Sequence, residues 1–194
     1  MIATILVRTV LTVICGLAFE IRDGQTQSVP PSPASRPATV DMQAGQSYRA
    51  GTRVRVPNGT ASFLIPSGWR GEALDNLGAV LLVSEKEAGF VLAFAVLNQT
   101  DEELFTLLGE PQPITETLVF EPAGAVTRKG RTLTANYLAG SLAGRGVAVM
   151  GPDLQGILFL HGRPQNEPRP MLSFLEELAD QVRFTPPHSS SASP

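Results

Sequence analysis

Arginine and valine alternate over residues 53–56, and a second alternating stretch ends at residue 65. A two-residue period of polar and apolar side chains is typical of a strand with one buried face and one face toward water. Asn58 and Gly59 stand between the two stretches, and this pair tolerates the positive φ angles of a tight hairpin turn. The pattern therefore predicts a β-hairpin whose arginines face solvent.

Longer apolar runs predict the centre of a sheet. Residues 79–84 and 90–97 are two such runs joined by a short charged turn. Further strands are predicted at residues 116–121, 124–128, 132–139, 146–150 and 156–161. Thr100 and Glu103 have the spacing of a capping box at the start of a short helix, and apolar residues at helical spacing predict a second helix over 171–182. The predicted fold class is α+β: an antiparallel sheet of about six to eight strands with one short and one longer flanking helix.

The two ends of the chain differ in composition from this domain. Residues 1–19 are apolar apart from Arg8, and Glu20 follows them. An apolar N-terminal run of this kind is typical of an export signal. An uncleaved N-terminal membrane segment is the alternative. Residues 20–47 are rich in Pro, Ser and Ala and predict an extended linker. Residues 185–194 predict a disordered tail. The globular domain is therefore expected over 48–184, in an exported protein that is periplasmic or extracellular, or anchored by its N-terminal segment.

Charge and cysteine content exclude several classes of function. The formal net charge of the 194-residue chain is −3, which lacks the strong positive field that holds a protein on nucleic-acid phosphates. The one cysteine, Cys15, lies in the predicted export segment, so we expect neither a disulfide nor thiolate chemistry in the domain. The spacing of His and acidic residues matches no zinc or calcium motif. We expect no nucleic-acid partner, no metal site and no cofactor.

An imidazole base for catalysis would have to be one of two histidines. His188 lies in the predicted tail. His161 ends a predicted strand and is better explained as a surface or strand-end residue than as a catalytic base, because the sequence indicates no partner for it. Adjacent carboxylates such as Glu102 and Glu103 point about 100° apart on a helix and do not easily share one substrate atom. We therefore predict no catalytic residues and a protein that is not an enzyme, with a hydrolase as the third hypothesis.

Residues 63–69 read Phe-Leu-Ile-Pro-Ser-Gly-Trp, and the chain closes with an apolar helical stretch over 175–184. With the order strands, helix, strands, helix, this resembles the PsbP/Mog1-like proteins, including bacterial PsbP-like and DUF1795-type secreted members. The resemblance covers about residues 48–184. It implies an antiparallel sheet flanked by helices and a non-enzymatic accessory or binding role. It implies no particular binding residue, since no residue here matches a known partner-binding motif.

Two groups of basic residues could bind a partner. They are Arg49, Arg53 and Arg55 along one strand, and Arg128, Lys129 and Arg131 around a turn. Such residues can simply be solvated strand positions or guards of a sheet edge. If they share a face, they would form a docking patch for an acidic protein or an anionic membrane surface. The leading hypothesis is therefore an exported, non-catalytic accessory or binding domain that acts through a protein partner, which could be membrane-associated.

The alternative hypothesis is a carrier of a small ligand or lipid. In this hypothesis the sheet and the C-terminal helix enclose an apolar pocket, because aromatic residues occur on the predicted central strands and on that helix. The expected lining residues are Phe94, Phe159 and Phe174.

Overall fold

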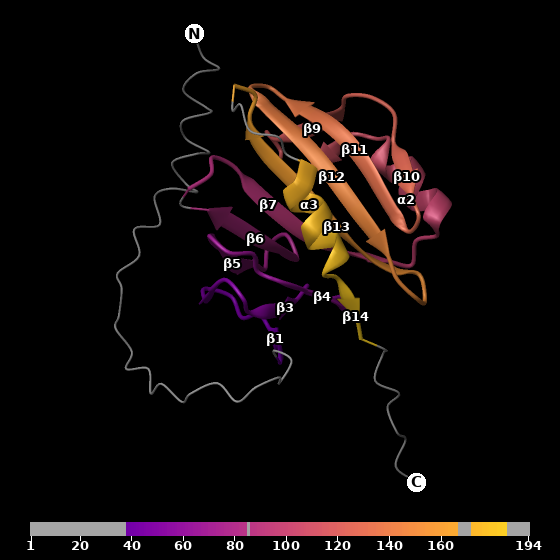
Figure 1. The fold of residues 1–194 in the computed structure, drawn as a ribbon. Helices are drawn as coiled ribbons and strands as arrows, with labels where there is room; N and C mark the ends of the chain where they lie inside the picture. The colour runs from indigo at the N-terminus through magenta and orange to yellow at the C-terminus, as the bar shows by residue number, and fades with distance from the viewer. Residues whose placement is uncertain (1–37, 85, 167–171, 186–194) are drawn as a thin grey trace. The chain divides into compact units, whose positions relative to one another are not determined.

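The computed structural model describes residues 38–84, 86–166 and 172–185 (Figure 1). All of them belong to one compact unit, residues 36–194. The predicted export segment, most of the predicted linker and nearly all of the predicted tail lie outside the described residues.

A sheet of ten strands forms the centre of this unit, and its strand pairs are antiparallel. In spatial order it contains β2 (Ser47–Tyr48), β5 (Trp69–Leu74), β6 (Ala79–Ser84), β7 (Phe90–Leu97), β13 (Gln155–Pro164), β12 (Leu142–Met150), β11 (Thr132–Ala139), β9 (Val119–Pro122) and β8 (Gln112–Pro113). The tenth strand, β10 (Thr127–Lys129), pairs with β11, as β9 does. The α+β class is confirmed, but the predicted count of six to eight strands is wrong. Three strands of this sheet were not predicted. β2 and β8 have two residues each, which is too short to show a period, and β5 buries Gly71 and Ala73, which are too small to give an apolar period.

A second sheet of four strands shares no strand with the first. Its spatial order is β1 (Thr39–Asp41), β3 (Arg53–Arg55), β4 (Ala61–Leu64) and β14 (Arg183–Phe184). The predicted hairpin is β3–β4, and Asn58 has the expected positive φ of 62°. β1 pairs with β3 in parallel, and Met42 packs against the core. The folded part therefore begins well before the predicted boundary at residue 48, so residues 39–47 are not a free linker.

The structure describes two helices of nearly equal length, α2 (Asp101–Leu108) and α3 (Leu172–Asp180). The capping box is confirmed: Thr100 Oγ1 accepts a hydrogen bond from the Glu103 backbone N–H, and the Glu103 carboxylate accepts one from the Thr100 N–H at 2.8 Å. These bonds hold the pKa of Glu103 below its usual value. Glu103 therefore has a structural role at the start of α2.

Apolar side chains pack on both faces of the larger sheet, which explains the continuous apolar runs in its central strands. On one face, α3 crosses β12 and β13, and the smaller sheet adds Val54 and Phe63 to the same cluster (Figure 1). The Phe63 and Phe159 rings meet edge to face at 5.2 Å. On the other face, α2 inserts Leu104 and Leu108 into a second cluster. We call these the α3 face and the α2 face.

Candidate functional site

The structure buries Arg53, the central residue of the first predicted basic group. Its side chain is 2% exposed, and Nη1 donates hydrogen bonds to the carbonyl oxygens of Ser62 (3.3 Å) and Gln181 (3.2 Å). Burial, and next the nearby charge of Arg183, lower the pKa of the guanidinium. The prediction that Arg53 faces solvent is wrong, because the chain that follows α3 closes over it. Arg53 cannot contact a partner directly.

The other two arginines of this group have separate environments. Arg49 is exposed. Arg55 is half-buried, and its Nε lies 3.4 Å from the carboxylate of Asp41 on β1. The three residues therefore do not present one basic face.

Arg128, in the second basic group, is engaged by the first turn of α2. It lies 3.2 Å from the Glu102 carboxylate and 3.8 Å from that of Asp101, and its guanidinium sits over the Phe105 ring, 5.8 Å from the centroid. These contacts balance its charge. Lys129 and Arg131 are exposed beside it.

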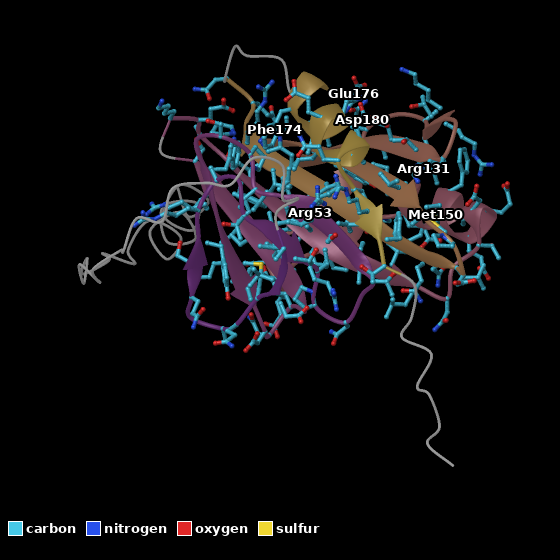
Figure 2. All side chains as sticks on the ribbon, turned by 60° about the horizontal axis from the view of Figure 1, so that its bottom comes forward. Arg53, Arg131, Met150, Phe174, Glu176 and Asp180 are labelled. Atoms are coloured by element: carbon cyan, nitrogen blue, oxygen red, sulfur yellow. The ribbon has the colours of Figure 1, made fainter. Side chains whose placement is uncertain are left out.

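A third arginine, absent from the sequence prediction, lies near this second group. The carbonyl of Arg131 accepts a hydrogen bond from the Met150 backbone N–H at 3.1 Å, and Figure 2 shows these two residues beside each other. The next residue, Gly151, is covered by Phe184: a Cβ at this glycine would lie 2.5 Å from the Phe184 ring. Arg183, which is exposed, directly precedes Phe184. The end of β12 therefore lies beside Arg131 on the larger sheet and beside β14, the strand of the smaller sheet that carries Arg183.

The turn between β12 and β13 projects from this end of the sheet. Asp153 and Leu154 both have φ of 55°, and hydrogen bonds from Gln155 N to Pro152 O and from Gly151 N to Gln155 O close the turn. Leucine is costly in this conformation, by about 1–2 kcal/mol, and glycine is the usual residue. The Leu154 side chain is 48% exposed. We define the basic tip as Leu154 with Lys129, Arg131 and Arg183.

His161 lies within β13 on the α3 face and is 5% exposed. Its ring stands edge-on to those of Trp69 (6.3 Å) and Phe174 (6.2 Å), which stack on each other at 4.6 Å. Burial, and next the charge of Arg163, lower its pKa to about 4. The prediction of a surface or strand-end histidine is therefore wrong, because α3 and its neighbours cover this part of the strand.

The three phenylalanines expected to line a pocket are not brought together. Phe159 is fully buried against Phe63, and Phe174 stacks on Trp69, both on the α3 face. Phe94 packs with the cluster on the α2 face. The prediction of one pocket with these three residues is wrong. Phe159 on β13 points to the α3 face, whereas Phe94 on β7 points to the α2 face, so the sheet lies between them.

The described residues offer few other candidate sites. An open depression follows the outer side of α2, lined by Gln99, Glu102, Glu103, Thr106, Leu107 and Glu110. Among described residues, no group of three or more His, Cys, Asp or Glu side chains could hold a metal ion. Neither described helix has the length and hydropathy needed to cross a membrane.

Comparison with known proteins gives no family. No protein-family model matches the chain, and no curated protein does. Among solved structures, the chain is similar to a crystal structure of a protein from Bacteroides thetaiotaomicron, with 10% sequence identity and a TM-score of 0.41. The match covers 74% of this chain and 49% of the other. A similarity this weak carries no argument about function, and the PsbP/Mog1-like resemblance stays a prediction.

Proposed function

We propose that this chain is an exported, non-catalytic accessory domain that docks a protein partner through its basic tip. The observation that carries the proposal is Leu154, an exposed leucine held in a backbone conformation that favours glycine. Strained backbone persists where other requirements outweigh its cost, and such positions cluster at functional sites. Because half of the Leu154 side chain faces solvent, its packing in the fold accounts for only part of that cost.

The charges around Leu154 indicate the chemistry of the partner. Lys129, Arg131 and Arg183 are exposed, and Arg128 beside them is already balanced by Asp101 and Glu102. An exposed leucine at the same end of the sheet as these exposed cations fits an acidic surface with an apolar socket. The cations would speed association and select the partner, while the leucine would be desolvated in the complex.

A photo-reactive amino acid at Asp153 tests this proposal. Asp153 and Ser141 are both exposed and lie in the turns at opposite ends of β12, so Ser141 is a matched control. Irradiation of cells is expected to give one discrete adduct, identifiable by mass spectrometry, from position 153 and none from position 141. The double substitution Lys129→Glu and Arg131→Glu is expected to reduce the yield at least tenfold. Identical adducts from both positions, or none, would contradict docking at the basic tip.

An anionic membrane surface is the competing occupant. Each Lys or Arg close to an anionic bilayer contributes about 1 kcal/mol, so the three cations alone would give weak binding. Vesicles of phosphatidylglycerol and phosphatidylcholine separate the two cases. If the protein sediments with the anionic vesicles but forms no protein adduct, the partner is lipid and the proposal of a protein partner fails.

A further inference from the structure

The open depression on the outer side of α2 is acidic. It has a volume of about 350 Å³, and three of the residues that line it are glutamates: Glu102, Glu103 and Glu110. Its lining residues, within the described part of the chain, include no basic residue. Leu107, which is 37% exposed, adds apolar surface. We call this depression the acidic groove. It combines the charge and the apolar surface that complement the basic tip.

The acidic groove adjoins the basic side of the tip. Arg128 on β10 donates a hydrogen bond from Nη2 to the Glu102 carboxylate at 3.2 Å, and Figure 1 shows α2 beside β10. Lys129, a residue of the tip, directly follows Arg128. A glutamate of the groove and a lysine of the tip are therefore separated by one arginine.

The groove also adjoins the apolar side of the tip. Gln155, which follows Leu154, lies opposite Leu97 in the pairing of β13 with β7. Leu97 is 37% exposed, so a second apolar side chain stands at this end of the sheet. Two positions after Leu97 the chain reaches Gln99, which lines the groove. Cations, exposed leucines and the acidic groove therefore share one continuous surface.

A surface that carries a patch and its complement side by side fits a copy of itself. A two-fold axis between the patches brings the tip of each copy to the groove of the other, so both contacts form at once. We propose that the partner of the basic tip is a second copy of this chain, in a symmetric dimer with two tip-to-groove contacts. Leu154 enters the groove beside Leu107, and Lys129 and Arg131 face its glutamates. This inference rests on the proposed function, because it names the partner of the same tip.

Charge reversal on each side of the contact tests this dimer. The tip variant carries Lys129→Glu and Arg131→Glu, and the groove variant carries Glu102→Lys and Glu110→Lys. In sedimentation experiments over a concentration series at low salt, each variant alone is expected to dimerise about tenfold more weakly than the wild-type protein, or less. An equimolar mixture is expected to recover the dimer, because the reversed tip of one variant meets the reversed groove of the other. Glu87→Lys, in the exposed turn at the far end of β7, is the matched control and is expected to dimerise like the wild-type protein.

Cross-linking gives a second readout. In the purified protein, a photo-reactive amino acid at position 153 is expected to form an adduct of two chains, joined to a peptide from residues 99–110. A wild-type protein that stays monomeric over the concentration series would overturn this inference, and so would variants that do not recover the dimer on mixing. If position 153 then captures a different protein in cells, the proposed function stands without the dimer. If it captures nothing, both fail. The wild-type series and the tip variant decide the question even if the groove variant fails to fold.

Discussion

Replacing Arg53 by glutamate is expected to destabilise the domain by about 3 kcal/mol or more. The substitution places a carboxylate where a guanidinium now donates to two carbonyl oxygens, those of Ser62 and Gln181. The position is 2% exposed, so the new charge would be buried against oxygens that repel it. The carbonyl oxygens would also lose their donor. Arg53→Met is expected to cost less, because it removes the donor without burying a charge.

Urea denaturation measures this effect, with Arg49→Glu as the matched control. Arg49 belongs to the same predicted basic group but is exposed, so its reversal is expected to change the free energy of unfolding by no more than about 0.5 kcal/mol. If Arg53→Glu were as mild as Arg49→Glu, Arg53 would face solvent as its strand parity predicts. The burial described for β3 would then be wrong.

His161 is expected to make the domain about 3 kcal/mol less stable at pH 4 than at pH 7. Its pKa is about 4 in the fold, against an ordinary value of 6.5 when the chain is unfolded. Between these values the unfolded chain binds more protons than the folded protein. The stabilisation from a neutral buried imidazole is therefore complete above pH 6.5 and is lost as the pH falls toward 4. The change is large because burial, reinforced by Arg163, opposes protonation in the fold.

His161→Gln isolates this contribution from the titration of carboxylates, since glutamine stays neutral at every pH. Free energies of unfolding are measured in urea at pH 7, 5.5 and 4 for both proteins. The wild-type value is expected to fall by about 3 kcal/mol more than the variant value over this range. Parallel curves for the two proteins would show that the histidine titrates alike in the folded and unfolded states, as a solvent-exposed residue would.

The elements that follow from local chemistry were predictable from sequence. The capping box at Thr100 depends on residues three positions apart, and the turn at Asn58 depends on the residue itself; both are confirmed. The helix predicted over 171–182 overlaps α3, which ends at Asp180. In each case the interactions that decide the structure lie within a few residues of one another.

The errors arise where distant segments decide the environment. Strand parity puts Arg53 and Val54 on different faces of β3 and so predicts an exposed arginine. The guanidinium is buried because it donates to the carbonyl of Gln181, which is 128 positions away in the sequence. His161 is buried because α3 returns to its face of the sheet, which the sequence of β13 does not reveal. The strain at Leu154 has no clear signal in the sequence, because glycine flanks the turn at positions 151 and 156 and only the backbone shows that φ is positive at Asp153 and Leu154.

Leucine 154 offers the most direct test of docking through the basic tip. In a protein with the photo-reactive residue at position 153, Leu154→Gly is expected to abolish the adduct, while the free energy of unfolding stays within about 0.5 kcal/mol or rises, because glycine relieves the strained turn. Leu138→Ser, at a leucine that is equally exposed at 48% but lies on β11, is expected to keep the adduct. An undiminished adduct in Leu154→Gly would contradict the account, as would a marked loss of stability without loss of the adduct.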